Sequence, residues 1–231
     1  MCVVVPAFNE GRAVASVVRE LRANLPGAAF VVIDDGSTDN TASEALNAGA
    51  TVVTLPVNLG IGGAVQTGYR YALRHDFEYA MQVDGDGQHD AAEATRLLHP
   101  VFAGEADLAT GSRWLGRGDY SATRGRRAGM HILSALVLWR TGTRFTDTTS
   151  GFRALGPTAL ALFGRSYPVD FPEVESIVLA CQSRLSVMEV PVRMRERAHG
   201  RSSIAGVRSA YYMARVAVAL LIGSPGPAHR G

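Results

Sequence analysis

Lysine is absent from this 231-residue chain, and all 23 basic residues are arginine. Codon use in a GC-rich genome is the simplest explanation of that bias. It also means that arginine, whose planar guanidinium binds pairs of oxygens, must make every contact between a basic side chain and a phosphate. Positive and negative charges nearly balance: the formal net charge is +2, which gives no reason to expect a nucleic-acid partner.

Cysteine is also scarce. The two cysteines, Cys2 and Cys181, supply neither a disulfide framework nor the spacing of a metal site, so a cytoplasmic location is the default. The first apolar segment begins almost at Met1, and we therefore expect no signal peptide.

No apolar run is long enough to cross a membrane. The last helical pattern has one apolar face, formed by Ile204, Val207, Tyr211, Ala214, Val218 and Leu221. Arg215 interrupts the longest apolar stretch there, which is shorter than the roughly 18–20 residues of a span. We expect this basic amphipathic helix either to lie on a membrane surface or to pack against the domain. Residues 224–231 are expected to form a disordered tail.

The composition is that of a globular domain, with 47% hydrophobic and 19% charged residues. Strand patterns alternate with helical patterns four times between residue 2 and about residue 102. Further strands are predicted at 106–110 and 185–192, and further helices at 130–140, 157–163 and 172–183. The alternation predicts a single α/β domain over residues 1–223 with a mostly parallel, doubly wound sheet.

Polar residues gather where the predicted strands end. Pro6, Ala7 and Glu10 follow the first strand, and Asp34 and Asp35 follow the second. The ligand crevice of an open α/β sheet lies at this edge, so we expect these residues to line a binding site. For the two aspartates, helix capping and compensation of a helix dipole are the alternative.

The most informative segment is DGDGQ at residues 84–88, which follows the fourth predicted strand. Asp84 and Asp86 stand two residues apart at the strand end, so both carboxylates can reach one hard divalent cation. Gly85 lets the backbone turn and leaves room for a ligand. A solvated turn is the alternative.

Two other ligand-binding motifs are excluded. An EF-hand loop in this segment would need glycine and glutamate where the chain has His89 and Thr95. A dinucleotide fingerprint beginning at Gly60 would need a third glycine where the chain has Val65. We interpret Gly62 and its neighbours as glycines that let the backbone approach a bound ligand closely.

Five arginines and only one acidic residue lie between residues 113 and 127. A solvated basic loop is one explanation. The other is an anion site in which Arg113 and Arg124 hold a diphosphate or a phosphate. A phosphate acceptor is already ionised at neutral pH and needs alignment and charge screening, whereas a sugar hydroxyl needs a general base.

Taken in order, the motifs resemble those of family 2 glycosyltransferases. They are PAFNE, DDGSTD, NLGIGGAVQTG, DGDGQHD, GSR and TSGFR, and they span about residues 3–204. Within the family, the chain is similar to the dolichyl- and polyprenyl-phosphate mannose synthase branch. The resemblance implies a GT-A-type fold with a donor-binding half at about 1–112 and an acceptor half at about 113–223.

The same resemblance implies a role for the residues at the strand ends. It makes Asp86 the first ligand of Mg²⁺ or Mn²⁺, with Asp84 and Gln88 as further ligands; Asp84 can alternatively bond to the nucleotide. The implied nucleotide pocket consists of Pro6, Ala7, Glu10, Asp34 and Asp35. We expect Gly62, Asp84 and Gly85 to contact the donor as well.

On the acceptor side, the resemblance implies a role for Asp147, just before TSGFR, as a base or in positioning the acceptor. Capping of its own loop is the alternative. Residues 195–203 resemble a loop that closes over the donor phosphates. The family often has lysine where this chain has Ser203, so Arg201 or Arg197 is the candidate phosphate ligand there.

The sequence thus predicts a metal-dependent, inverting enzyme that moves a hexose from a nucleotide diphosphate sugar to dolichyl or polyprenyl phosphate. GDP-mannose is the favoured donor and UDP-glucose the next. We expect a peripheral location at the inner face of the cell membrane, with a membrane surface or a membrane protein as partner. The alternatives are a transferase to a sugar hydroxyl in polysaccharide or glycolipid assembly, and a non-catalytic nucleotide-sugar-binding partner of a membrane protein.

Overall fold

The computed structural model describes residues 1–115, 124–195, 215–216 and 218, with the backbone alone for residues 124–128. The predicted tail at 224–231 and the predicted apolar face from Ile204 to Ala214 lie outside the described residues. No helix in the described part of the chain is long and apolar enough to cross a membrane.

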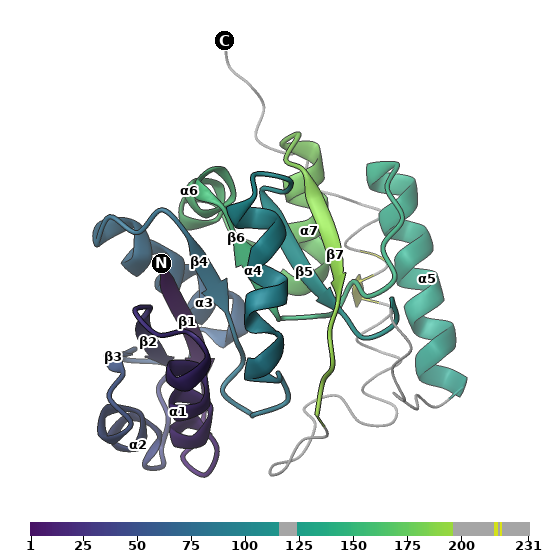
Figure 1. Ribbon diagram of the computed structural model, residues 1–231. Helices are drawn as coiled ribbons and strands as arrows, with labels where there is room; N and C mark the ends of the chain where they lie inside the picture. The colour runs from purple at the N-terminus through teal and green to yellow at the C-terminus, as the bar shows by residue number, and fades with distance from the viewer. Residues whose placement is uncertain (116–123, 196–214, 217, 219–231) are drawn as a thin grey trace.

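A seven-stranded sheet runs through the molecule in the order β3-β2-β1-β4-β6-β5-β7 (Figure 1). Its strands are β1 (Cys2–Ala7), β2 (Ala29–Asp34), β3 (Thr51–Thr54), β4 (Ala80–Gln82), β5 (Leu108–Ser112), β6 (Arg153–Leu155) and β7 (Val187–Pro191). Every pairing is parallel except the two made by β6. The predicted mostly parallel sheet is therefore confirmed.

Helices cover both faces of this sheet (Figure 1). They are α1 (Val14–Asn24), α2 (Thr41–Asn47), α3 (Gly60–Arg74), α4 (Ala94–Phe102), α5 (Arg124–Thr141), α6 (Pro157–Arg165) and α7 (Pro172–Gln182), with a 3-10 turn, η1, at Ala91–Glu93. Val3 and Val5 of β1 pack into one core with α1 and α4, whereas Cys2 and Val4 pack into a second core with α3 and α6. A strand buried on both faces needs a continuous apolar run, which is what β1 has.

The structure differs from the prediction at two elements. The three-residue strand β6 was not predicted, because it is very short and begins at Arg153, a charged residue that is fully buried here. Helix α5 begins at Arg124, six residues before the predicted start at residue 130. Its first turn is rich in arginine and glycine, so the apolar periodicity starts later than the helix does.

Candidate active site

Two loops that follow β1 and β2 are bonded together at the carboxyl edge of the sheet. The Asn9 N–H donates to Ser37 Oγ at 2.9 Å, and the Thr38 N–H donates to Asn9 Oδ1 at 2.9 Å. The Glu10 N–H donates to Thr41 Oγ1 at 2.9 Å. These bonds fix residues 9 and 10, and Glu10 is one of the residues predicted to lie in the nucleotide pocket.

Asp34 and Asp35 are both buried, and each organises backbone beside this pocket. Asp34 Oδ1 accepts a bond from the Ser37 N–H at 3.1 Å, which closes the turn after β2. Asp35 Oδ1 accepts a bond from the Leu59 N–H at 2.7 Å and so fixes the residue that precedes α3. Burial raises the pKa of the Asp35 carboxyl. The Asp35 bond thus lies at the N-terminal end of α3, as the helix-capping alternative expects, whereas Asp34 bonds to Ser37 in a turn that ends before α2 begins at Thr41.

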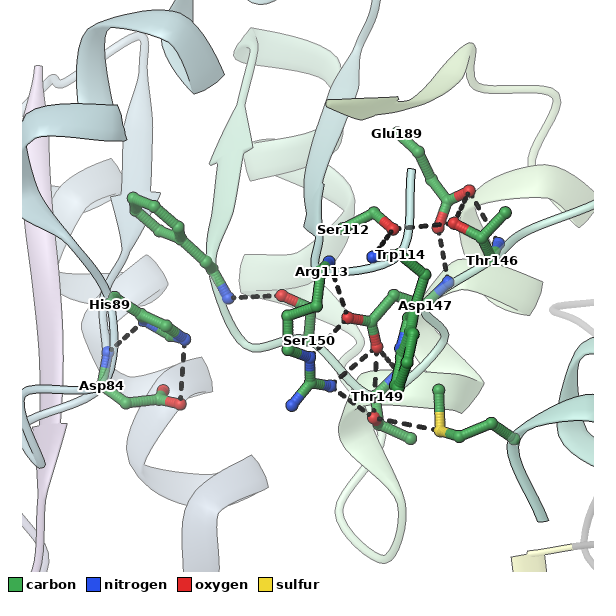
Figure 2. Close-up of polar contacts among 12 residues, drawn as sticks. Asp84, His89, Ser112, Arg113, Trp114, Thr146, Asp147, Thr149, Ser150 and Glu189 are labelled. Atoms are coloured by element: carbon green, nitrogen blue, oxygen red, sulfur yellow. Dashed lines mark hydrogen bonds and ion pairs between the residues drawn. The ribbon is translucent and has the colours of Figure 1, made fainter. Parts of the chain in front are cut away.

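Asp84 lies at the end of β4 with about one third of its side chain exposed. Its own N–H donates to His89 Nδ1 at 3.1 Å, which leaves His89 Nε2 at 3.6 Å from Asp84 Oδ2 (Figure 2). Gln82 Nε2 reaches Asp84 Oδ1 at 3.3 Å, and Gln82 Oε1 accepts a bond from the Tyr69 hydroxyl at 3.0 Å. Within the described residues, the Asp84 carboxylate thus receives only long contacts, so its oxygens retain capacity for a ligand.

Glycines let three segments meet around Asp84. A Cβ on Gly85 would lie 3.2 Å from both Ala7 Cβ and Pro6 O, so the segment after β4 packs directly on the predicted donor residues of β1. A Cβ on Gly151 would lie 2.8 Å from both oxygens of Asp84. The TSGFR segment therefore forms one wall of the Asp84 corner, a contact that the sequence did not predict.

Asp84, Asp86 and Gln88 supply oxygen atoms of the kind that a hard divalent cation binds. Asp86 is 6% exposed, and its Oδ1 accepts a bond from the Gln88 N–H at 3.0 Å, which closes a turn over residues 86–88. Two carboxylates and one amide oxygen on one glycine-rich turn are ligands that Mg²⁺ and Mn²⁺ accept. No three acidic, histidine or cysteine side chains of the described residues form a group that could hold a metal ion, so the cation would also need oxygens of its substrate or water.

The fully buried Arg153 holds the TSGFR segment in place beside Asp84. Arg153 Nε donates to Ser150 O at 3.1 Å, and its two terminal nitrogens donate to Ser176 Oγ and to the carbonyl oxygen of Glu173. Burial raises the pKa of the Glu173 carboxyl, and the negative charge of Asp84 adds to the shift. Arg153 belongs to the TSGFR motif, but nothing in the sequence showed that its charge is directed into the core.

Arg113 and Asp147, which the sequence placed on the acceptor side, form a bidentate ion pair (Figure 2). Arg113 Nε lies 2.6 Å from Asp147 Oδ2, and Arg113 Nη2 lies 2.8 Å from Asp147 Oδ1. The Arg113 N–H also donates to Oδ2, and Thr149 donates to Oδ1 through its N–H and its hydroxyl. Asp147 is fully buried and both of its oxygens are engaged. Its carboxylate therefore holds Arg113 in place.

The described structure does not place three of the predicted site residues, Gly62, Arg124 and Arg201, beside Asp84 or Arg113. A Cβ on Gly62 would lie 2.5 Å from Pro168 O, so the close backbone approach at this glycine is made by the chain itself. The side chain of Arg124 and the whole of Arg201 lie outside the described residues. His89, stacked 4.8 Å from the Phe152 ring, was missed as a partner of Asp84, although it stands within the DGDGQHD motif.

Comparison with known proteins gives the family. The sequence model of glycosyl transferase family 2 matches residues 2–161. The chain therefore belongs to glycosyl transferase family 2, and the prediction that it is a glycosyltransferase is confirmed.

Two relatives are named for transfer to a lipid phosphate. A polyprenol monophosphomannose synthase of Mycolicibacterium smegmatis is 30% identical, over 93% of this chain and 84% of its own length. An undecaprenyl-phosphate mannosyltransferase of Micrococcus luteus is 28% identical, over 88% of this chain and 86% of its own length.

A solved structure supports the fold. Glucosyl-3-phosphoglycerate synthase of Mycobacterium tuberculosis, crystallised with Mn²⁺, UDP and glucosyl-3-phosphoglycerate, superposes with a TM-score of 0.70 at 22% identity. The match covers 96% of this chain and 78% of that one. At this identity the likeness concerns the fold alone, and it confirms the predicted GT-A-type architecture.

Proposed function

We propose that this protein transfers a hexose from a nucleotide diphosphate sugar to the phosphate of a polyprenyl phosphate, with inversion at the anomeric carbon. The observation that carries the proposal is the Arg113–Asp147 pair. Both oxygens of Asp147 are occupied by hydrogen-bond donors, so this carboxylate is unsuited to take a proton from a sugar hydroxyl. A guanidinium held in one orientation suits an acceptor that is already an oxyanion.

The reaction then needs alignment more than acid–base chemistry. A phosphate oxygen of the acceptor attacks the anomeric carbon opposite the diphosphate, the bond from that carbon to the diphosphate breaks, and the nucleoside diphosphate leaves. A bound Mg²⁺ or Mn²⁺ would supply charge stabilisation for the leaving diphosphate. Asp84, Asp86 and Gln88 would hold the ion, His89 and Gly151 would fix Asp84, and Arg113 would align the acceptor phosphate.

For the donor, the two relatives named for mannose transfer favour GDP-mannose. UDP-glucose is the second candidate donor. A thermal-shift panel of GDP, UDP and their sugars with Mn²⁺ reads the base preference directly, since a ligand that binds only the folded state raises its stability.

We also propose that the protein works at a membrane surface. Helix α5 exposes large apolar side chains, with Ile132 57%, Leu138 41% and Trp139 65% exposed. The helix lies at one side of the molecule (Figure 1), and an amphipathic helix of this kind can lie in the plane of a bilayer surface. Co-sedimentation with anionic lipid vesicles should fall for Trp139→Ser. Equal sedimentation of variant and wild type would contradict this location.

The transfer reaction itself is tested with radiolabelled GDP-mannose or UDP-glucose, polyprenyl phosphate and Mn²⁺. The expected product is a glycosyl phospholipid that mild acid hydrolyses, and its formation should vanish with EDTA and return with Mg²⁺ or Mn²⁺. Asp86→Ala should abolish transfer, while Asp76→Asn, at an exposed residue between α3 and β4, should not. Undiminished transfer by Asp86→Ala would refute the metal assignment.

The same assay separates the alternatives. Transfer to a saccharide but not to the lipid phosphate would favour an enzyme that acts on a sugar hydroxyl. Donor binding by calorimetry without transfer or hydrolysis would favour a non-catalytic partner of a membrane protein.

A further inference from the structure

Glu189 of β7 reaches across to the loop that carries Asp147. Its Oε1 accepts a bond from the Asp147 N–H at 2.7 Å, and its Oε2 accepts bonds from the Thr146 N–H at 2.7 Å and the Thr146 hydroxyl at 3.0 Å (Figure 2). Thr146 Oγ1 in turn lies 2.7 Å from Ser112 Oγ, which accepts a bond from the Trp114 N–H. One half-buried carboxylate thus binds two successive backbone N–H groups, those of Thr146 and Asp147.

Glu189, Asp147 and Arg113 form a series of connected charged groups that leads to the proposed acceptor side. Glu189 holds the backbone of Asp147, and Asp147 holds the guanidinium of Arg113 through two oxygens. Glu189 pairs with Thr110 in the β5–β7 register, and Arg113 follows Thr110 by three residues. Glu189 and Arg113 are therefore both anchored by the neighbouring strands β5 and β7. Hydrogen bonds from N–H groups to a carboxylate are charge-assisted and directional, so they set the orientation of the loop.

We propose that Glu189 is a positioning residue for the acceptor phosphate: it orients Asp147, which aims Arg113. The inference rests on the proposed function, because it takes Arg113 to contact the acceptor phosphate. A purely structural role for Glu189 predicts a different result. It would lower stability and change the kinetics for both substrates together, whereas a positioning role acts on the acceptor alone.

Glu189→Gln is the informative variant. Its side chain keeps the shape of glutamate, but its amide nitrogen cannot accept one of the two backbone N–H bonds. We expect the KM for polyprenyl phosphate to rise on the order of tenfold, because small misplacements of an aligning group cost factors of this size. The KM for the donor and the thermal shift produced by nucleotide with Mn²⁺ should stay within about twofold of wild type. Glu105→Gln, at an exposed loop residue, is the matched control.

A double-mutant cycle tests whether the effect passes through Arg113. In an Arg113→Met background, Glu189→Gln should leave the acceptor KM unchanged, because the group that it orients is gone. An equal rise of the acceptor KM in both backgrounds would overturn the inference, and so would a Glu189→Gln enzyme that behaves like Glu105→Gln. If Glu189→Gln fails to fold, Glu189→Asp, which keeps the charge, enters the same cycle with the same criteria.

The outcomes also separate this inference from the proposed function. A wild-type enzyme that transfers no sugar to polyprenyl phosphate would refute the proposed function whatever the Glu189 variants do. A wild-type enzyme that makes the glycosyl phospholipid, together with an unaltered acceptor KM in Glu189→Gln, would refute only the role of Glu189.

Discussion

Gly151→Ala should disturb the proposed metal site while it leaves the fold intact. The added Cβ would lie 2.8 Å from both carboxylate oxygens of Asp84, where ordinary contacts begin at 3.4 Å. Asp84 must therefore swing away by about 0.6 Å, whereas metal–ligand distances hold to within about 0.2 Å. Disturbing a residue that orients a ligand typically lowers metal affinity by about 10- to 100-fold, and we expect a loss of this size for Mn²⁺.

The cost in stability should be small, because the group that must move is a partly exposed side chain. An alanine also restricts the unfolded chain, which offsets about 0.4–1 kcal/mol of any strain. Mn²⁺ affinity is measured by electron paramagnetic resonance of the free ion in the presence of GDP or UDP. Gly156→Ala is the matched control, since its nearest new contacts are ordinary ones at 3.4 Å. Wild-type Mn²⁺ affinity in Gly151→Ala would show that Asp84 is not a ligand.

Three further predictions concern the support of the site. Tyr69→Phe removes a buried hydrogen bond to Gln82 and should lower the free energy of unfolding, measured in urea, by about 1–3 kcal/mol. Tyr71→Phe is the control, and equal stability of the two variants would contradict the prediction. Gly62→Ala places a methyl group 2.5 Å from Pro168 O and should lower the free energy of unfolding by about 1–3 kcal/mol, with the donor affinity unchanged. Weaker donor binding with wild-type stability would instead support a contact between Gly62 and the donor. Burial raises the pKa of Glu173 above its usual 4.5, so the folded chain binds that proton more tightly and stability falls as pH rises from 4.5 toward the raised value. The melting temperature of Glu173→Gln relative to wild type should therefore increase from pH 4.5 to pH 7, and a constant difference would refute the shift.

Much of the fold could be predicted because its signals are local. The apolar run of β1 and the helical pattern of α1 each report burial within a few residues, and their alternation implies a parallel sheet. Strand β6 escaped prediction because the buried charge of Arg153 is compensated by hydrogen bonds to α7, from residues 20 and 23 positions away in the chain. No local pattern records that compensation.

The candidate site divides in the same way. Asp84 and Asp86 were placed together by their spacing, and Asp34 and Asp35 by the rule that parallel strands end at one edge. Whether a carboxylate is available or engaged is a different question, because it depends on which donors the fold brings to its oxygens. Asp147 shows this most clearly: its partners Arg113 and Glu189 lie 34 and 42 residues away.

The sequence by itself determined the family, the parallel sheet and the edge at which the polar residues gather, because strand and helix periodicity and short motifs are written in neighbouring residues. Only the tertiary structure decided that Asp147 binds Arg113, that Glu189 binds the backbone of Asp147 and that Gly151 lies against Asp84. Hydrogen bonds and steric contacts act over about 3 Å, and only the folded chain brings residues so distant in sequence within that range.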